Sequence, residues 1–504
     1  MNNVLEYQLF MNGKWSRGSS GKWMDVINPA NSEVVARVPS GTETDINNAV
    51  ISARKAFDSG VWSGKSVEER VKVLSNIAAR IISQGERLGF LETLTTGGII
   101  RRTVLADGKE VGFRFLTAAK TLEQLPRVEH QMAPGFFPMH SYVKHEPVGV
   151  CALITPWNLP MMLGGIKIAS ALAMGNTIVV KPASITPVTT LELAKIIHEA
   201  GVPPGVINVV TGPGSTVGSY LAGHPEVDRV SFTGSTEVGR RISHQGADSV
   251  KRIGLELGGK SPLIILDDAD MDVAVNISLL AFLFHTGQAC ESGTRLFVPR
   301  AMQQELVERM IAQIRKLKIG DPLSPETDIG PVVSEQQLKT IMEYVEIGKK
   351  EGAVLAYGGT RLTGPEYDRG FFFEPTIFTN CTNSMKQVRE EIFGPVQCVI
   401  PYDSVEEAIA MANDSPYGLG GGICSRNVGL AQKIAGRLRT GTVWINTWHV
   451  LRPDMPFGGY KQSGLGRESS YQGLMEFTEV KHICQSLVYD SRTTALSRLI
   501  GLDK

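Results

Sequence analysis

Between residues 148 and 260, short apolar runs alternate with helical segments, and this alternation limits the possible folds more than any other feature of the sequence. The run Thr177–Lys181 is typical of a buried strand, and Thr186 to Ala200 has helical spacing and ends at Gly201. The same alternation continues with strands at 206–210 and 229–232 and helices near 215–222 and 236–243. Parallel strands need long crossover connections, usually helices, so the pattern predicts a mostly parallel, doubly wound sheet.

A second α/β region is expected from about residue 263 to residue 460. It starts with the apolar strand Pro262–Leu266 and includes a helix over Met302–Lys318. Ahead of the first region, residues 8–40 read as short strands and residues 43–125 as helices. The length favours about three domain-sized units, and the expected fold class is α/β.

The charges balance, with 51 Lys and Arg against 51 Asp and Glu. The chain therefore has no general attraction for nucleic acid or an anionic membrane, and we expect neither as a partner. No charged residue lies between Glu146 and Lys167, a stretch long enough to span a bilayer. Because Pro147, Pro156 and Pro160 interrupt it, a strand, a turn and the start of a helix are the better interpretation.

The six cysteines are scattered, at positions 151, 290, 381, 398, 424 and 484. They form no CxxC pair and no Cys/His cluster with zinc spacing, so we expect no metal site. Low cysteine density in a large chain is typical of a reducing compartment, and the first residues lack the pattern of a signal peptide. The expected location is the cytoplasm.

Cys290 and Glu256 are the first candidate catalytic pair, and each lies in a glycine-marked turn. Cys290 ends Gly287-Gln288-Ala289-Cys290, and Glu256 begins Glu256-Leu257-Gly258-Gly259. A thiolate can form a thioester, and a carboxylate can activate the water that hydrolyses it. A buried, inert cysteine is the alternative interpretation of Cys290.

Asn158 adds a third candidate group. It lies in Thr155-Pro156-Trp157-Asn158-Leu159-Pro160, between two prolines that stiffen the turn. A rigid amide in that place can donate a hydrogen bond to an oxyanion. The alternative is that Asn158 only satisfies turn backbone.

Taken together, these segments resemble the aldehyde dehydrogenase family, from about Asn28-Pro29 to about Val480-Lys481. The matching segments, in the family's order, are Ile154–Pro160, Lys181–Ser184, Phe232–Ser235, Glu256–Pro262, Gly287–Cys290, Glu390–Pro395, Gly441–Asn446 and Pro456–Gly459. Many ordered matches are far more specific than any single motif. The resemblance implies NAD(P)+-dependent oxidation of an aldehyde to a carboxylic acid through a cysteine thiohemiacetal and thioester.

The resemblance also implies an organisation. It gives two doubly wound α/β domains, a Rossmann-like cofactor domain and a catalytic domain, plus a small β extension that joins subunits of a homodimer or homotetramer. The expected bounds are 1–127 with 148–258 for the NAD(P)-binding domain, 259–472 for the catalytic domain, and 128–147 with 473–504 for the bridging segments.

The roles that the resemblance implies at the catalytic centre are distinct. Cys290 is the nucleophile, Glu256 the base for water, and Asn158 with the Cys290 backbone N–H the oxyanion donors. Lys167 matches a family lysine that relays a proton. The implied cofactor contacts are Ile154, Thr155, Pro156, Trp157, Lys181, Ala183, Ser184, Gly214, Phe232, Thr233, Gly234, Ser235, Leu257, Glu391 and Phe393.

Ser184 bears on the choice between NAD and NADP. Many family members that prefer NAD have Glu at this place, where it accepts from the ribose hydroxyls and repels a 2′-phosphate. A neutral hydroxyl removes the repulsion, so we expect NADP to be accepted. Lys181 is implied to bind the adenosine ribose, and Ser235, at the start of a helix, is expected to contact phosphate.

The aldehyde pocket is expected to be apolar or aromatic. Its implied lining is Met162, Ile166, Phe284, Glu291, Leu451 and Phe457. Arg452 leaves a carboxylated semialdehyde open as an alternative substrate, unless it only pairs with Asp454.

Four other functions compete with this one. The run Gly254–Ser261 fits a phosphate-loop pattern, but Pro262 and a strand follow where a helix is required. A coenzyme-A-acylating relative usually lacks the base at Glu256. A cysteine hydrolase would pair the thiol with His285, but no triad pattern is visible, and a non-catalytic binding protein on the same fold stays a remote alternative.

Overall fold

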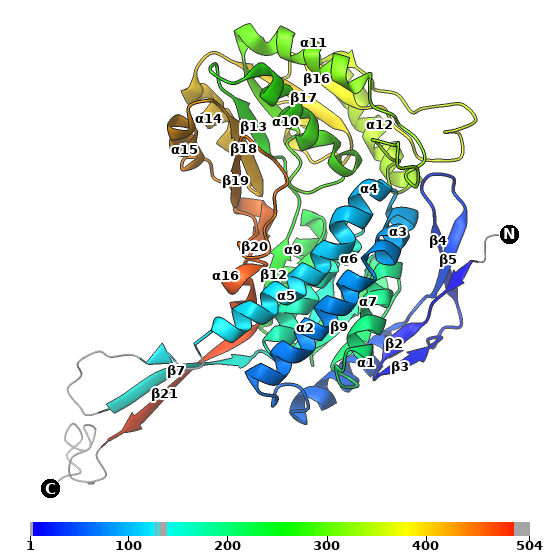
Figure 1. Ribbon diagram of the computed structural model, residues 1–504, viewed down its shortest axis with the longest axis vertical. Helices are drawn as coiled ribbons and strands as arrows, with labels where there is room; N and C mark the ends of the chain where they lie inside the picture. The colour runs from blue at the N-terminus through cyan, green and yellow to red at the C-terminus, as the bar shows by residue number, and fades with distance from the viewer. Residues whose placement is uncertain (1–3, 127–128, 131–138, 488–504) are drawn as a thin grey trace.

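The computed structural model describes residues 4–126, 129–130 and 139–487, and it forms two α/β lobes from which a β ribbon projects (Figure 1). The mixed α/β, doubly wound architecture expected from the sequence is confirmed. The expected residue bounds of the domains stay a prediction.

Short strands and a layer of helices make up the N-terminal part. The strands are β1 (Leu5–Glu6), β2 (Leu9–Met11), β3 (Lys14–Ser16), β4 (Trp23–Ile27) and β5 (Val34–Pro39). The helical elements are α1 (Glu43–Asp58), α2 (Val67–Ser83), α3 (Gly85–Thr96), α4 (Ile100–Arg102), η1 (Thr103–Asp107) and α5 (Gly108–Gln124). Thr42 caps α1, because its hydroxyl accepts from the Asp45 N–H while the Asp45 carboxylate accepts from the Thr42 N–H.

The first large sheet carries the predicted strand–helix alternation. Its parallel strands are β8 (Val150–Ile154), β9 (Thr177–Lys181), β10 (Ile207–Val209), β11 (Arg229–Thr233) and β12 (Arg252–Glu256). The connecting helical elements are α6 (Pro160–Ala173), α7 (Val188–Glu199), η2 (Gly214–Gly218), α8 (Ser219–Gly223) and α9 (Thr236–Ala247). Apolar side chains pack on both faces of the sheet, against α2, α5, α6 and α7 on one face and α1, α8 and α9 on the other.

The strand order of this sheet fixes where a ligand can bind. The order is β12-β11-β8-β9-β10, with β20 (Gly464–Leu465) beside β12 and with β2 and β3 beyond β10. The chain order reverses between β8 and β11. In open α/β sheets, ligands bind outside the carboxyl ends of the strands at such a switch point.

The second large sheet has the same character. Its strands are β13 (Pro262–Ile265), β14 (Arg295–Pro299), β15 (Val354–Tyr357), β16 (Thr376–Thr379), β17 (Val396–Tyr402), β18 (Gly420–Cys424) and β19 (Thr442–Ile445). Its helical elements are α10 (Met271–Leu283), η3 (Phe284–Gly287), η4 (Arg300–Met302), α11 (Gln303–Ile314), α12 (Glu335–Lys350), α13 (Lys386–Arg389), α14 (Val405–Asn413) and α15 (Val428–Ala435). The strand order is β15-β16-β17-β14-β13-β18-β19, and only the β15–β16 pair of this sheet is antiparallel.

The chain then returns to the first lobe. After η5 (Lys461–Ser463), β20 pairs antiparallel with β12, which places Gly464 opposite Glu256. After α16 (Ser470–Met475), β21 (Thr478–Ser486) pairs along the whole of β7 (Met139–Pro147), which also pairs with β6 (Glu129–His130). Figure 1 shows this ribbon reaching away from both lobes. Of the predicted bridging segments, residues 128, 131–138 and 488–504 lie outside the described residues.

Candidate active site

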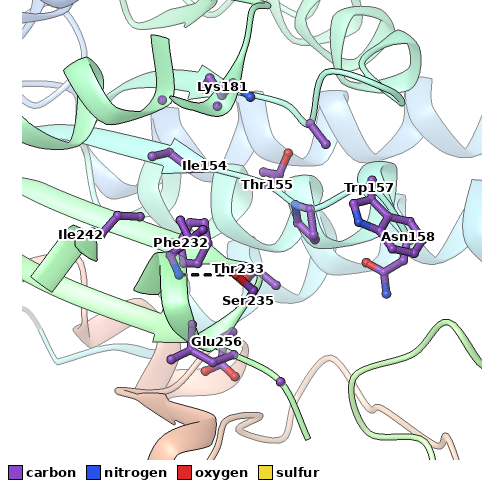
Figure 2. A pocket seen from close by; sticks show the side chains of 18 of the residues that line it. Ile154, Thr155, Trp157, Asn158, Lys181, Phe232, Thr233, Ser235, Ile242 and Glu256 are labelled. Carbon is purple, nitrogen blue, oxygen red and sulfur yellow. Dashed lines mark hydrogen bonds between the residues drawn. The ribbon is translucent and has the colours of Figure 1, made fainter. Parts of the chain in front are cut away.

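A cleft of about 660 Å³ opens between the carboxyl ends of the first sheet and the second lobe. Every cofactor contact expected from the sequence lines this cleft, from Ile154 at the end of β8 to Phe393 before β17. Asn158, Glu256 and Cys290 line it as well. Figure 2 shows how Lys181, Ile154, Phe232 and Glu256, from four neighbouring strands, face one space.

One end of the cleft suits an adenosine with or without an added phosphate. Lys181 is buried at the end of β9, and burial lowers the pKa of its ammonium to about 8. The Ser184 hydroxyl donates to the carbonyl of Gly212 at 2.7 Å. Arg241, on α9, also lines this part of the cleft. Among the described residues that line the cleft, the carboxylates are Glu256 and Glu391, so none comes from this end.

The middle of the cleft has the features of a phosphate site. Ser235 caps α9, and its hydroxyl accepts from the Val238 N–H. The first turn of a helix presents N–H groups and the positive end of its dipole to an anion. The buried hydroxyls of Thr155 and Thr233 have no hydrogen-bond partner among the described residues. These donors and the shape of the turn fit a pyrophosphate.

The other end is formed by the second lobe. The Glu391 carboxylate accepts from the Gly259 N–H at 3.1 Å, and burial raises its pKa to about 7. A Cβ on Gly258 would lie 2.2 Å from that carboxylate, so only glycine allows this approach. The Phe393 ring meets the Trp157 ring edge to face, with centroids 5.1 Å apart.

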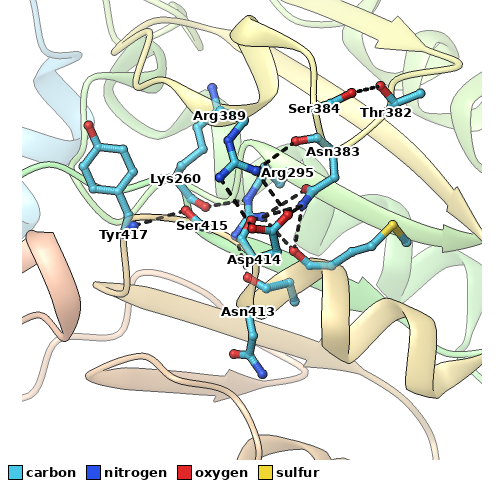
Figure 3. Close-up of polar contacts among 12 residues, drawn as sticks. Lys260, Arg295, Thr382, Asn383, Ser384, Arg389, Asn413, Asp414, Ser415 and Tyr417 are labelled. Atoms are coloured by element: carbon cyan, nitrogen blue, oxygen red, sulfur yellow. Dashed lines mark hydrogen bonds and ion pairs between the residues drawn. The ribbon is translucent and has the colours of Figure 1, made fainter.

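A buried guanidinium holds the backbone next to Gly259. Arg295, at the start of β14, donates to the Lys260 carbonyl at 2.8 Å and to the Ala412 carbonyl at 2.8 Å. In Figure 3, Asn383 and Asp414 surround it, and Asp414 also pairs with Arg389. This cluster fixes the amino ends of β13 and β14, from which the second lobe faces the cleft.

Asn158 is anchored to the turn that carries Cys290. Its side-chain amide donates to the Gln288 carbonyl at 2.9 Å, and Pro160 begins α6 directly after the turn. An amide nitrogen carries two hydrogens, so one donor remains for a ligand.

Glu256 ends β12 and is buried. Its Oε2 has no hydrogen-bond partner among the described residues, and burial with repulsion from Glu468 raises its pKa well above the usual value. Lys167, which does not line the cleft, pairs with Glu468 and donates to the Ser231 hydroxyl at 2.9 Å. Lys167 therefore acts on Glu256 through Glu468.

Cys290 is partly exposed at the cleft, which makes the inert-core interpretation unsuitable. Its thiol donates to Glu291 Oε2 at 3.3 Å, and burial with the nearby carboxylates raises its pKa. The imidazole of His285 has no hydrogen-bond partner among the described residues, so the hydrolase pairing is not formed. A Cβ on Gly287 would lie 2.2 Å from the Gly394 carbonyl, so this turn packs directly on the Glu391–Pro395 segment.

The residues expected in the aldehyde pocket do not line the large cleft. Met162 and Ile166 are buried on α6, and Leu451 and Phe457 follow β19. Phe284 stacks on His449 with ring centroids 4.4 Å apart, and His449 Nδ1 lies 2.8 Å from Glu291 Oε1. The structure thus brings Phe284 and Glu291 together through a histidine. Arg452 pairs with Asp454 through two hydrogen bonds at the surface.

Sequence reasoning missed His449, Glu468, Arg241 and Gln337. Arg241 and Gln337 line the cleft, and Glu468 contacts Lys167. The glycine-rich run before Glu468 is a signal for a turn near a site. For His449 we find no local signal, since it depends on packing against Phe284 and Glu291.

The described residues contain no group of His, Cys, Asp and Glu that could hold a metal ion. In the same part of the chain, no helix has both the length and the apolar character needed to cross a membrane.

Comparison with known proteins gives a consistent result. The model of the aldehyde dehydrogenase family matches residues 15–483. The chain is 43% identical to betaine aldehyde dehydrogenase of Bacillus subtilis, over 95% of this chain and 97% of that protein. It is 40% identical to cytosolic aldehyde dehydrogenase 1 of Rattus norvegicus, over 96% of each. A crystal structure of betaine aldehyde dehydrogenase from Staphylococcus aureus in complex with NAD+ superimposes with a TM-score of 0.95 at 40% identity, covering 98% of each chain.

Proposed function

Since the chain belongs to the aldehyde dehydrogenase family and is an NAD(P)+-dependent oxidoreductase acting on aldehydes, we propose which of its residues carry each step. One observation supports the assignment above all. A partly exposed thiol, a buried carboxyl and an anchored amide lie together in a cleft of dinucleotide size. Cys290, Glu256 and Asn158 are the nucleophile, the base and the oxyanion donor.

In the first step, Cys290 Sγ attacks the aldehyde carbon and a thiohemiacetal forms. The developing oxyanion is stabilised by the free N–H of the Asn158 amide and by the Cys290 backbone N–H. The hydrogen bond from Asn158 to Gln288 supports this role, because it fixes the amide before the substrate arrives.

The cofactor is held by the residues that line the cleft. Lys181 and Ser184 lie at the adenosine end, Ser235 at the pyrophosphate, and Glu391 with Phe393 at the nicotinamide end. Bound NAD(P)+ supplies the hydride acceptor that oxidation of an aldehyde requires.

Glu256 then draws a proton from the water that hydrolyses the thioester. A raised pKa suits this step, because it makes the carboxylate a stronger base toward water. The buried pair of Lys167 and Glu468 lies beside Glu256 and gives the proton a route away from it.

NADP+ is accepted as well as NAD+. The adenosine end has Lys181 and Arg241 and lacks a carboxylate among the described lining residues, so nothing there repels a 2′-phosphate.

We place the substrate among apolar or aromatic aldehydes, because Phe284 and His449 stack next to the nucleophile. Betaine aldehyde, the substrate named for the relatives from Bacillus subtilis and Staphylococcus aureus, is the second candidate. The Phe284 and His449 rings favour it, since aromatic rings attract a quaternary ammonium group. A carboxylated semialdehyde is less suitable, because Asp454 already occupies the Arg452 guanidinium.

Two variants test the assignment. Cys290→Ala is expected to lose NAD(P)H formation by about 10⁴-fold or more while NAD(P)+ still binds. Glu256→Gln is expected to give a burst of NAD(P)H followed by slow turnover, because acylation proceeds and hydrolysis does not. Oxidation by Cys290→Ala near the wild-type rate, or an unchanged steady rate for Glu256→Gln, contradicts the assignment. A panel of aliphatic, aromatic, cationic and acidic aldehydes then ranks the substrates.

The β7–β21 ribbon supports assembly as a homodimer or homotetramer. It projects from the lobes with half-exposed side chains along its length, and such a ribbon needs a partner surface to cover it (Figure 1). Light scattering of the purified chain decides between the two states. The cytoplasm remains the proposed location, and cell fractionation tests it.

A further inference from the structure

Of the carboxyl groups near the nucleophile, Glu291 and Glu256 differ in their contact with it. Glu291 Oε2 accepts directly from Cys290 Sγ at 3.3 Å. Glu256 lines the cleft that Cys290 also lines, but its Oε2 has no hydrogen-bond partner among the described residues. The proposed mechanism uses Glu256 and leaves Glu291 without a role in proton transfer.

The position of Glu291 is fixed from several sides. Its side chain is only 3% exposed, and its second oxygen, Oε1, lies 2.8 Å from Nδ1 of His449, whose side chain is 6% exposed. The Trp448 indole N–H donates to the Glu291 carbonyl at 3.2 Å. The His449 ring in turn lies against Phe284. With Oε1 held by the imidazole, Oε2 stays directed at the thiol.

The two carboxyls also differ in charge. Burial opposes ionisation of Glu291, but hydrogen bonds from His449, from its own backbone and from the thiol outweigh it and lower its pKa. Burial and Glu468 raise the pKa of Glu256. The carboxyl that touches the sulfur is therefore held as an anion more strongly than the other carboxyl. Two carboxyls with pKa values pushed apart are suited to different steps.

We propose that Glu291 accepts the thiol proton as Cys290 attacks the aldehyde, which leaves Glu256 for the water of the second step. The inference rests on the proposed function. As the bond between Sγ and the aldehyde carbon forms, the S–H bond breaks and its proton passes to Glu291 Oε2. The carbonyl π electrons move to the oxygen held by Asn158. When hydrolysis frees the sulfur, the proton returns to it from Glu291.

His449 is a positioning residue in this scheme. It holds Oε1 and keeps Glu291 ionised, while its own Nε2 has no hydrogen-bond partner among the described residues. The other charged groups that face the thiol are Glu256 from β12 and Glu391 from the segment before β17. The Arg102 guanidinium lies 5.3 Å from the centroid of the Phe284 ring, which packs against His449. Among the described residues, the hydrogen bond from the thiol goes to Glu291, so this carboxylate is in direct reach of the proton.

The test measures alkylation of Cys290 by iodoacetamide across pH, without aldehyde or cofactor. In the wild-type enzyme, the carboxylate in contact with the thiol takes the proton. The alkylation rate is therefore expected not to change with pH around neutrality. In Glu291→Gln the rate at pH 7 is expected to fall about 10²-fold. It should then climb about tenfold per pH unit and approach the wild-type rate in alkali, because only hydroxide is left to remove the proton.

The opposite result overturns the proposal. If Glu291 only repels the thiolate, Glu291→Gln will react faster than wild type at pH 7. A wild-type alkylation rate that rises tenfold per pH unit also contradicts the proposal. This measurement does not depend on whether the Glu291→Gln variant folds. Glu308→Gln, an exposed carboxylate on α11, is the matched control and should keep the wild-type profile.

His449→Asn gives a second, independent check. It leaves Glu291 in place but removes the imidazole that lowers the Glu291 pKa, so the level part of the profile should begin at a higher pH. An unchanged profile contradicts the role of His449. Because alkylation involves no turnover, these results are separate from the Cys290→Ala and Glu256→Gln experiments that test the proposed function.

Discussion

The two lobes contribute to the site from opposite ends of their strands. In the first sheet the functional residues lie at the carboxyl ends of the strands, as Lys181 ends β9 and Glu256 ends β12. In the second sheet they precede the strands, as Cys290 precedes β14 and Glu391 precedes β17. The rule that α/β ligands lie at carboxyl edges therefore locates the cofactor half of the site and says nothing about the nucleophile.

The two halves also differ in what they present. The first lobe offers backbone turns, hydroxyls and single charges around an open cleft. The second offers carboxylates that are already hydrogen-bonded, the partly buried Glu391 to Gly259 and the buried Glu291 to His449. Single substitutions on the first lobe should change one property at a time, and the predictions below test that difference.

The largest effect is expected from Asn158→Ala. Loss of the oxyanion donor should lower kcat by about 10²–10³-fold while the dissociation constant of NAD(P)+ stays within about twofold. Steady-state kinetics and cofactor titration measure the two quantities. Asn76→Ala is the control, since Asn76 also donates to a backbone carbonyl but lies on α2, outside the cleft. A large change in NAD(P)+ affinity would show that one substitution on the first lobe alters both catalysis and cofactor binding.

Ser184→Glu is expected to have the next largest effect. A carboxylate at this end should weaken NADP+ binding by roughly 10–100-fold through repulsion of the 2′-phosphate, with little change for NAD+. Fluorescence titration with both cofactors measures the ratio. Ser184→Ala, which removes only the hydrogen bond to Gly212, should leave the ratio near the wild-type value. Equal losses for both cofactors would place the 2′-phosphate elsewhere.

The pH dependence of NADP+ binding also tests whether the 2′-phosphate lies at this end of the cleft. Burial lowers the pKa of Lys181 to about 8, so its ammonium is charged below that pH and neutral above it. Binding of a phosphate above pH 8 must then take up a proton, and the affinity for NADP+ should fall by up to about tenfold per pH unit. NAD+, without the 2′-phosphate, serves as the control. A parallel fall for both cofactors would remove Lys181 from phosphate binding.

The smallest effect is expected on the second lobe, at Arg452. Its side chain is 63% exposed and paired with Asp454, so Arg452→Gln should change kcat/KM for neutral aldehydes by less than about twofold. The measurement is repeated with a carboxylated aldehyde. A tenfold drop in kcat/KM for the carboxylated aldehyde alone would support the semialdehyde alternative. It would also show that a single residue of the second lobe recognises the charge of the substrate.

Much of the first lobe was accessible from sequence, because strand, turn and helix follow one another in a short stretch of chain. The predicted strand Thr177–Lys181 has the observed bounds of β9, and the family and fold class are confirmed. Spacing alone did not single out the reciprocal pair of Thr42 and Asp45 that caps α1.

The second lobe was harder to predict. Glu291 was expected in the aldehyde pocket, but its contact with His449 depends on a loop more than 150 residues away in the chain. No periodicity records such a contact. The roles assigned to Lys181, Ser184 and Glu391 remain predictions until their variants are measured, although all of them line the cleft.

The pairing of β20 with β12 has a consequence for biosynthesis. The strand beside Glu256 comes from Gly464 and Leu465, and the Leu257 N–H donates to the Ser463 carbonyl. A chain growing on the ribosome therefore exposes its sulfur long before the neighbours of its base exist. A translation product that ends before residue 463 carries both Cys290 and Glu256 but lacks the strand that lies beside the Glu256 backbone.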